Sequence, residues 1–537
     1  MTVVFRNGTV FDGRKHVGRT DVAVEGDRIV AVGPDLDVGG EIVDLSGGLL
    51  VPGFIDAHVH AVQGGLERVR CDLSVDAENK QVYLETIAAY AHAHPDRPWI
   101  LGGGWSMAVF PGGTPTAAEL DTVVSDRPAF LPNRDHHGAW LNTAALRRAG
   151  IDRHTPDPPD GRIERDADGE PTGTLHEGAM RLVTRLLPRT QDSEYDQALL
   201  EGQRYLHSLG VTGWQDAIVG AYAGMDDPGP IYWRAARRGD LTAYVVGALW
   251  WERDRGLEQL PELRRRRDEL TDGRFRATTV KVMQDGVAEN GTAAMLEPYL
   301  DRCGHATGNR GHSFVTASAL ATAVAALDED GFQIHVHAIG DRAVRESLDA
   351  FAGLRDAGRS DLRHHLAHLQ IVHPDDVGRF AELGVAANLQ MLWACLEPEM
   401  TELTLPYLGA ERAGWQYPFG DLHRAGARLV AGSDWPVTSP DPLLAMHTAV
   451  NRTGYRAAGP MGSEPFLPGQ ALDLATAFAA YTSGSAWINH RDDAGVIRPG
   501  AVADLVVLDR DPFAGPVEEI GATRVVSTWV DGAKVHG

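Results

Sequence analysis

Residues Pro52 to His60 read PGFIDAHVH, an apolar run that is broken by glycine and ends in two histidines separated by one valine. In a β-strand, residues two apart point to the same side. If this run is a strand, the imidazoles of His58 and His60 face one place, where they can bind a metal ion. The alternative is an ordinary polar strand end, so the rest of the chain has to supply further ligands.

The middle of the chain alternates strand-like apolar segments with helical ones. Counted from the opening run, these segments predict eight strands. The predicted strands are Phe54–His60, Gly210–Asp216, Leu241–Leu249, Thr278–Gly286, Phe332–Asp341, Leu362–Gln370, Val385–Gln390 and Ala427–Pro436. Eight strands in alternation with helices are typical of a (β/α)8 TIM barrel, an α/β fold of about 250 residues before insertions.

Both ends of the chain differ from this middle. Residues 1–51 and 491–537 contain short strand-like segments separated by turn residues. We expect the two ends to form one small β-sandwich domain beside a barrel at 52–490. Residues 61–205, between the first two barrel strands, are far too many for a strand–helix connection. They predict an inserted subdomain on the catalytic face, where it can act as a lid or a substrate wall.

Composition limits the class of function. The 537 residues are 43% hydrophobic and 23% charged, which is typical of a globular chain. The formal net charge of −24 disfavours nucleic acid and anionic membranes as partners. Three scattered cysteines give no disulfide framework, and neither a signal peptide nor a membrane-spanning run is visible. We therefore expect a cytoplasmic protein that acts on a small-molecule substrate.

Side chains at the carboxyl ends of barrel strands converge on one site. Read in chain order, these ends supply four histidines, one lysine and one aspartate. They are His58, His60, Lys281, His337, His368 and Asp434. Imidazole and carboxylate ligands suit zinc and related divalent ions. We predict a centre of one or two divalent metal ions, with Zn²⁺ as the expected metal.

Lys281 differs from the other five residues because an ammonium group cannot bind a metal. Burial among cations shifts a lysine toward the neutral amine. A neutral amine can react with carbon dioxide to give a carbamate, whose two oxygens can bridge a pair of metals. The alternative is a salt bridge to Asp285, four residues further along the chain. The residues alone leave both interpretations open.

The chain resembles the metal-dependent amidohydrolase superfamily and, within it, the YtcJ-like branch that includes N-substituted formamide deformylase. The motifs that carry the resemblance are PGFIDAHVH, LDTVVSDRPAFLPNRDHHGAWLN, DGEPTGTLHEGA, VKVMQDG, GTAAMLEPY, HVHAIGD, AGSDWPV, YTSGSAW and GVIRPGAVADLVVLD. The resemblance implies a (β/α)8 barrel with a flanking β-sandwich and one or two divalent metals. By position it implies that Lys281 is the bridging, carbamylated lysine and that the metal ligands are His58, His60, His337, His368 and Asp434.

Two positions depart from the pattern of this branch. Ala367 precedes His368 where relatives often carry an acidic residue, and Met391 follows Gln390 where relatives commonly carry proline. Neither position is a metal ligand. Both lie where the substrate would be contacted, so they put substrate specificity in doubt and leave the chemistry unchanged.

These features predict hydrolysis of a carbon–nitrogen bond outside peptides, in a linear N-substituted amide or formamide. A metal-activated hydroxide would attack the carbonyl carbon. Asp434 would serve as general base toward the water and then as general acid toward the leaving amine. The alternatives are a single-metal deaminase or cyclic amidase on the same barrel, and a regulatory protein without catalysis. A homodimer is expected by analogy with the family alone.

Three further residues are candidates for a place near the site. Trp105 and His137, in the inserted segment, are candidates for the substrate wall, although such loop residues also serve as structural plugs. His335 shares the face of His337. We expect His335 to pack one layer deeper in the barrel, held by hydrogen bonds, rather than to act in catalysis.

Overall fold

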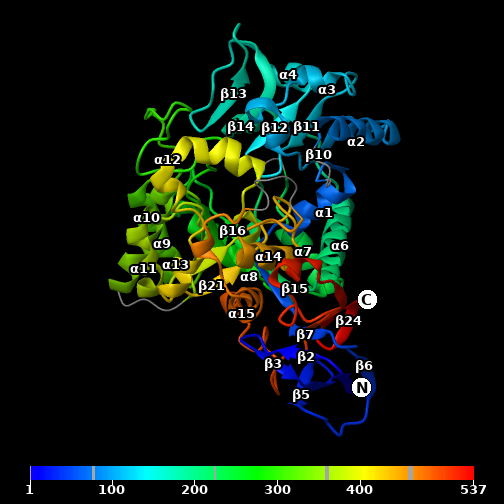
Figure 1. The fold of residues 1–537 in the computed structure, drawn as a ribbon. Coiled ribbons are helices and arrows are strands. Elements are labelled where there is room, and N and C mark those ends of the chain that lie inside the picture. Colours follow the sequence, from blue (N-terminus) through cyan, green and yellow to red (C-terminus); the bar gives the residue numbers. More distant parts are fainter. Residues whose placement is uncertain (1, 75–78, 223–224, 357–361, 457–463) are drawn as a thin grey trace.

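Eight parallel strands lie side by side at the centre of the computed structural model (Figure 1). The structure describes residues 2–74, 79–222, 225–356, 362–456 and 464–537. The strands are β8 (Phe54–Val59), β15 (Val211–Val219), β16 (Tyr244–Trp250), β17 (Phe275–Met283), β18 (Gln333–Ala338), β19 (His365–His368), β20 (Ala386–Leu389) and β21 (Leu429–Ala431). Each strand pairs with the next one in the chain, so all eight predicted strands are confirmed.

The first and last strands of this sheet meet and nearly close it. The backbone N–H of Asp434, just beyond β21, donates to the carbonyl oxygen of His58 on β8 over 2.7 Å. The side chain of Asn388 on β20 donates to the carbonyl oxygen of Ala57 over 2.9 Å. The sheet is therefore the predicted (β/α)8 barrel.

The alternation of residues along the strands explains which side chains enter the barrel. On β17 and β18, Val280, Val282, Ile334 and Val336 belong to the large apolar core between sheet and helices. The residues between them are polar and equally buried, and they face the opposite, inner side. A polar interior is unusual for a parallel sheet, whose strands are normally apolar on both faces. It marks the inside of this barrel as a place for chemistry.

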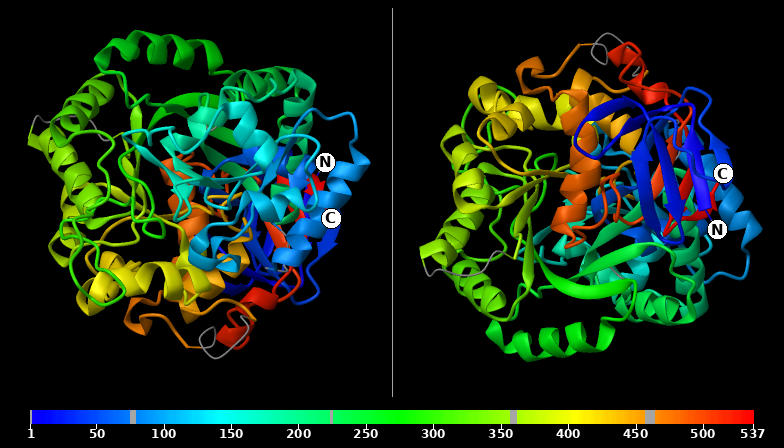
Figure 2. Two further views of the ribbon diagram at one scale, coloured as in Figure 1. Left: turned by 90° about the horizontal axis from the view of Figure 1, so that it is seen from above. Right: turned by 90° about the horizontal axis from the view of Figure 1, so that it is seen from below.

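Helices surround the barrel, as the view along it shows (Figure 2). The ring includes α7 (Gly229–Arg238), α8 (Leu260–Leu270), α9 (Ala317–Glu329), α10 (Asp341–Asp356), α11 (Pro374–Leu383), α13 (Phe419–Arg424) and α14 (Pro442–Asn451). Helix α11 shows how the sequence sets its limits. Pro374 occupies its first turn, and Gly384 follows it in a left-handed conformation with φ of 71°. None of the described helices is long and apolar enough to cross a membrane.

Strands from both ends of the chain form two further sheets at the bottom of Figure 1. One sheet contains β5 (Arg28–Gly33), β4 (Asp21–Glu25), β1 (Thr2–Arg6) and β6 (Glu41–Asp44). The other contains β24 (Ala533–His536), β23 (Val525–Val530), β22 (Leu505–Leu508), β7 (Leu49–Pro52), β2 (Thr9–Phe11) and β3 (His16–Arg19). Apolar residues of both sheets share one core. The predicted β-sandwich is therefore present. The domain limits that we assigned to it, 1–51 and 491–537, stay a proposal.

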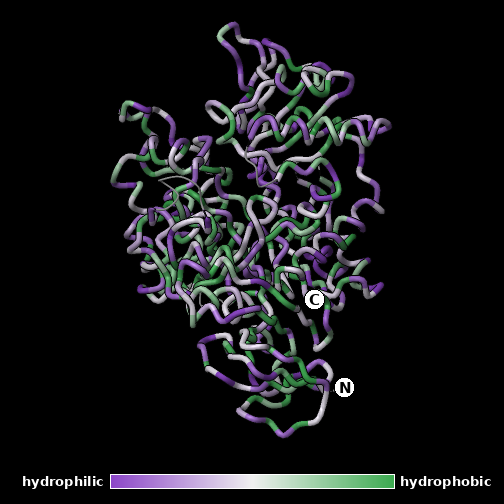
Figure 3. The backbone as a smooth tube through the Cα atoms, turned by 45° about the vertical axis from the view of Figure 1, so that its right-hand side comes forward, coloured by the Kyte–Doolittle hydropathy of each residue, from purple (hydrophilic) through white to green (hydrophobic). Residues whose placement is uncertain are grey.

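The long insertion after β8 carries its own sheet, at the top of Figure 1. Its strands are β13 (Gly161–Arg165), β14 (Pro171–Glu177), β12 (Gly138–Leu141), β11 (Ala129–Pro132), β10 (Ile100–Gly103) and β9 (Cys71–Asp72). Hydrophilic residues gather at the outer loops of this part (Figure 3). The segment proposed as the insert, 61–205, also includes α1 (Ala61–Val69) and most of α6 (Asp192–Ser208), and both helices add residues to the barrel core.

Candidate functional site

The structure brings all six predicted site residues to one cavity at the carboxyl ends of the barrel strands. The first lies near the end of β8 and the second directly follows that strand. The next three lie on β17, β18 and β19, one on each strand, and the last follows β21. These residues are His58, His60, Lys281, His337, His368 and Asp434. All six side chains are buried, with Asp434 5% exposed. Residues up to 376 positions apart in sequence therefore share one small space, as the barrel topology predicts.

The carboxylate of Asp434 lies among three of the imidazoles. Its Oδ1 atom is 3.1 Å from Nε2 of His58 and 3.0 Å from Nε2 of His60. Its Oδ2 atom is 3.8 Å from Nδ1 of His368. Ligand atoms of His58, His368 and Asp434 all lie within 4.8 Å of one another. This spacing allows all three residues to bind the same ion.

Unpaired nitrogens show that these side chains fit a metal ion. Both ring nitrogens of buried His368, and Nδ1 of His60, have no hydrogen-bond partner within the described part of the chain. Such groups are costly to bury unless a partner satisfies them. Burial lowers the pKa of His58 to about 3 and holds the pKa of His368 well below its ordinary value. The rings of His58 and His368 are neutral, so their lone pairs are free to bind a divalent cation.

His337 is held so that one nitrogen remains for a ligand. Its Nε2 atom donates to the backbone carbonyl of Gly286 over 3.1 Å, which leaves Nδ1 as the acceptor. Burial and the nearby Lys281 ammonium hold the pKa of His337 well below its ordinary value. The ring is therefore a neutral donor, which suits a second ligand position beside the group around Asp434.

Lys281 lies in the same cavity without the salt bridge that we considered for it. The Asp285 carboxylate is taken by three backbone N–H groups, those of Ala294, Ile339 and Gly340. No ion pair or hydrogen bond of the Lys281 amine is found among the residues that the structure describes. Burial lowers the pKa of Lys281 to about 7. The amine is therefore partly neutral at neutral pH, which is the reactive form.

His335 packs one layer deeper, as predicted, and holds His58. Gln215 donates through Nε2 to Gln333 (3.0 Å) and Asn489 (3.2 Å), so its carbonyl oxygen is the atom that accepts from Nδ1 of His335 at 2.7 Å. The neutral His335 ring then accepts at Nε2 from Nδ1 of His58 over 2.9 Å. This chain places the proton of His58 on Nδ1 and leaves Nε2 free for a metal.

The backbone is strained at two of the candidate ligands. His368 has a φ of 82° and Asp434 a φ of 58°, in a region that non-glycine residues rarely adopt. Such strain persists only where the surrounding structure enforces it, and it is concentrated at functional sites. Nearby Gly432 allows the approach, because a Cβ atom there would lie 2.5 Å from the Cβ of His58.

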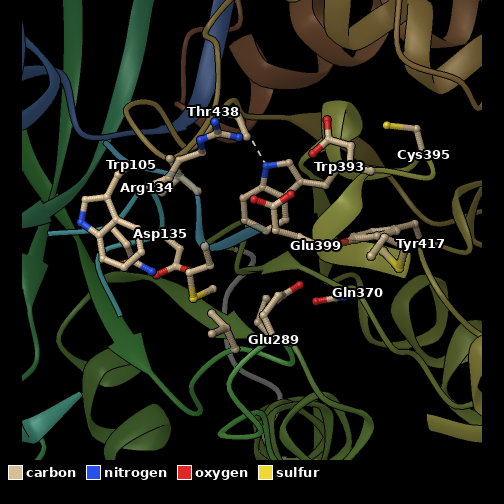
Figure 4. Close-up of a pocket in the computed structure, with 17 residues that line it drawn as sticks. Trp105, Arg134, Asp135, Glu289, Gln370, Trp393, Cys395, Glu399, Tyr417 and Thr438 are labelled. Atoms are coloured by element: carbon tan, nitrogen blue, oxygen red, sulfur yellow. Dashed lines mark hydrogen bonds between the residues drawn. The ribbon is translucent and has the colours of Figure 1, made fainter. Parts of the chain in front are cut away.

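A second cavity opens beside the candidate metal centre and shares part of its wall. Figure 4 shows Trp105 and Tyr417 on opposite sides of this cavity, with carboxylates of Asp135, Glu289 and Glu399 between them. We call it the outer cavity. The inserted segment supplies one wall, and loops after the barrel strands supply the others. A reacting group at the metal centre can thus have its remainder in the outer cavity.

Comparison with known proteins agrees with this geometry. The profile of the amidohydrolase family matches residues 41–536. The chain belongs to the amidohydrolase family. This amidohydrolase is 29% identical to the putative amidohydrolase YtcJ of Bacillus subtilis, over 92% of the chain and 90% of YtcJ. It is 28% identical to the N-substituted formamide deformylase of Arthrobacter pascens, over 99% of the chain and 97% of that enzyme.

A solved structure shares the fold of the amidohydrolase along nearly its whole length. It is the crystal structure of an uncharacterized metal-dependent hydrolase from Pyrococcus furiosus, which is 26% identical. The match covers 95% of this chain and 100% of that one, with a TM-score of 0.70. The resemblance that the sequence motifs indicated is thus confirmed at the level of family and fold.

Trp105 and His137 of the amidohydrolase both line the cavities. Trp105 is fully buried, donates to the carbonyl oxygen of Leu131 over 2.7 Å and forms a wall of the outer cavity. His137 lies at the metal centre, its Nδ1 atom 2.9 Å from the Glu177 carboxylate and its ring centroid 5.9 Å from that of His337. Their contact with substrate stays a prediction.

Several residues at or beside the site of the amidohydrolase were not singled out from the sequence. Glu177 supports His137, and its only signal was its place in the motif DGEPTGTLHEGA. Trp393, in the segment that departs from the family pattern, stacks on His368 with ring centroids 5.4 Å apart and planes 5° apart. Gln390 accepts the backbone N–H of His368 over 2.6 Å. The segment that departs from the family pattern therefore forms the wall beside a candidate ligand.

Proposed function

We propose that this protein is a metal-dependent hydrolase that cleaves a carbon–nitrogen bond outside peptides, in a linear amide of the N-substituted formamide kind. The observation that carries the proposal is the convergence of four histidines, one buried lysine and Asp434 beside an open cavity. The similarity to a deformylase along 99% of the chain supports the substrate class. The expected partner is accordingly a small molecule.

The ligands for the metal follow from the geometry of the site. His58, His60, His368 and Asp434 would hold one divalent ion, with Zn²⁺ as the expected metal. When bound, such an ion supplies a Lewis acid for the amide carbonyl and lowers the pKa of water toward about 7. His335 keeps the ligand nitrogen of His58 unprotonated and aimed at the centre.

Asp434 is the residue that we propose to move protons. Its carboxylate is buried and reaches the centre of the site, where it can accept a proton from the attacking water. It then returns the proton to the nitrogen of the breaking bond. An amine leaves poorly as an anion, so this delivery decides whether the carbon–nitrogen bond breaks. Asp434 would therefore have two roles, as a metal ligand and as the general base and acid.

Lys281 is proposed to be carbamylated. Its amine nitrogen would form a bond to the carbon of carbon dioxide and release one proton to water, which gives a carbamate anion. The lowered pKa of Lys281 supports this step because only the neutral amine is nucleophilic. The carbamate oxygens, with His337, would then complete a place for a second divalent ion.

One observation favours a site with a single metal as the second candidate. The close group of ligand atoms contains His58, His368 and Asp434, and His337 does not belong to it. A single-metal site on this barrel would suit a deaminase or a cyclic amidase, with Lys281 as an ordinary amine. The two candidates differ in the product that they release, which is ammonia or a ring-opened acid rather than a free amine and an acid.

Product analysis tests the proposed function. Zinc-loaded protein is incubated with N-hexylformamide, and formate and hexylamine are followed by NMR, with the Asp434→Asn variant as the inactive control. Release of both products by wild type alone supports the proposal. The opposite result would be no hydrolysis of this or other linear amides, together with turnover of a cyclic amide or release of ammonia from an amino-substituted ring. That result would replace the proposed function with the second candidate.

A further inference from the structure

The outer cavity adjoins the candidate metal centre. Its empty space, counted together with the open mouth, is about 700 Å³. It shares five wall residues with the metal centre, namely Asp135, Val287, Ile339, Trp393 and Val437. An arm of the substrate that leaves the reacting bond can therefore enter the outer cavity.

Carboxylates from three separate segments of the chain meet on the wall of the outer cavity. Asp135 belongs to the inserted segment, Glu289 follows β17, and Glu397 and Glu399 follow β20. Each is at most partly exposed. Their convergence from three parts of the chain distinguishes them from a solvated run of acidic residues on a single helix.

Three of these carboxylates are only partly satisfied by the protein. Asp135 accepts the backbone N–H of His137 over 2.7 Å, Glu289 accepts the hydroxyl of Thr404 over 3.2 Å, and Glu399 accepts the hydroxyl of Ser106. In each case one carboxylate oxygen is used. In the part of the chain that the structure describes, no ion pair joins any of the three to a basic side chain.

Aromatic rings complete the wall. Trp105 and Trp393 line the cavity together with Tyr417 (Figure 4). The indole nitrogen of Trp393 donates to Thr438 over 3.1 Å, and that of Trp105 donates to a backbone carbonyl, so both ring faces are fixed in place. Aromatic faces attract organic cations, and the attraction grows when the cation is removed from water.

The charge balance of this wall is negative. Among the described residues that line it, Arg134 supplies the single basic side chain, against four carboxylates. A negative, partly enclosed wall attracts cations and repels anions. An anionic arm is therefore disfavoured, and a neutral arm would bring no positive charge to Asp135, Glu289 and Glu399.

We propose that the outer cavity selects substrates whose arm carries a positively charged group, an ammonium or a guanidinium, at the end of an apolar spacer. The spacer would lie along Trp393, and the cation would lie among Asp135, Glu289 and Glu399. This inference rests on the proposed function for the reacting bond and adds the class of the substrate arm. The crowding of acids supports it, because burial together with the charges of Asp135 and Glu399 raises the pKa of Glu289 to about 7.

Three matched probes test the proposal on zinc-loaded protein. N-formyl-pentane-1,5-diamine carries an ammonium group, N-hexylformamide carries a methyl group in its place, and 6-formamidohexanoate carries a carboxylate. We expect kcat/KM to be at least about tenfold higher for the cationic probe than for the neutral one, which is about 1.4 kcal/mol, and lowest for the anionic one. If the neutral probe were hydrolysed as fast as the cationic one, the inference would be overturned and the proposed function would stay intact.

Variants connect the preference to the wall. Glu289→Gln and Glu399→Gln are expected to lower the cationic-to-neutral ratio of kcat/KM several-fold. Glu382→Gln, on the exposed outer surface of α11, is the matched control and should leave the ratio unchanged. An unchanged ratio in both cavity variants would also overturn the inference.

Calorimetry distinguishes failure of the proposed function from failure of the inference. If no probe is hydrolysed, the proposed function is contradicted, and the binding of small molecules to the outer cavity still tests the inference. Hexylamine, which carries an ammonium group at neutral pH, should bind more tightly than neutral hexan-1-ol, and Glu289→Gln should reduce the difference. Equal binding of hexylamine and hexan-1-ol would overturn the inference.

Discussion

The Nδ1 atom of His58 lies 2.9 Å from the Nε2 atom of His335, and both rings are buried. His335 is bound in turn by Gln215, whose amide orientation is fixed by Gln333 and Asn489. The proton between the two rings therefore belongs to His58. One layer below the candidate metal centre, the barrel thus decides which nitrogen of His58 is free for a metal.

Replacing His335 is expected to weaken metal binding. His335→Ala should lower the zinc affinity about 10- to 100-fold, because the free nitrogen and the ring orientation of His58 are no longer fixed. The affinity is measured by competition with a chromophoric chelator.

The matched control for this change is His364→Ala. His364 is also buried, but it contacts the backbone N–H of Ile334 and the Asp328 carboxylate, away from the metal centre. This control should lose folding stability without losing zinc affinity. Zinc binding by His335→Ala that equals wild type would show that His58 needs no such support.

Replacing Asp434 by asparagine is expected to stop turnover. The amide cannot accept a proton from water, so kcat should fall by at least about 10²-fold, the size of a general acid–base contribution. Binding of N-hexylformamide, measured by calorimetry, should stay detectable. Zinc content has to be determined in parallel, because the same residue is a candidate ligand. Near-normal turnover in a zinc-loaded variant would remove Asp434 from its role in proton transfer.

The fold could be predicted in detail because each of its signals is local. The run PGFIDAHVH, like the later apolar runs, combines buried apolar residues on one side with polar ones on the other. The two-residue period of a β-strand is enough to recognise this pattern. The polar ligands lie at the carboxyl ends of these strands, which barrel topology brings together. His58 and Asp434 could therefore be placed in one site from sequence, although 376 positions separate them.

The outer cavity could not be predicted in this way. Asp135 and Glu289 lie in turns, and Glu399 begins the short π-helical segment Glu399–Thr404, so no strand or helix period connects the three. Only the packing of the inserted segment against the segments after the barrel strands brings them to one wall. The bond between His58 and His335 escaped prediction for a related reason. Sequence placed His335 one layer deeper, but its partner across the barrel depends on strand register and ring rotation.

Replacing Lys281 distinguishes a metal pair from a single ion. If a carbamate on Lys281 bridges two ions, elemental mass spectrometry of wild type should give about two metals per chain, and Lys281→Ala should give fewer. Bicarbonate in the growth medium and buffer should raise occupancy in wild type and not in the variant. About one metal per chain in both proteins would favour the single-metal candidate and remove Lys281 from the ligands.

The last prediction concerns pH and the charge of Glu289. Burial and the neighbouring Asp135 and Glu399 raise its pKa to about 7, so the side chain is neutral below that pH and charged above it. Arg134 and Tyr417 also line this cavity and keep their charge states across the range considered. The preference for the cationic probe over the neutral one should therefore rise between about pH 6 and pH 8.

The ratio of kcat/KM for the two probes isolates this effect, because ionisations at the metal centre act on both probes and cancel. Glu289→Gln should make the ratio independent of pH and hold it near the low-pH value of wild type. A ratio that rises equally in wild type and Glu289→Gln would assign the titration to another group, and a flat ratio in wild type would show that Glu289 does not contact the cation.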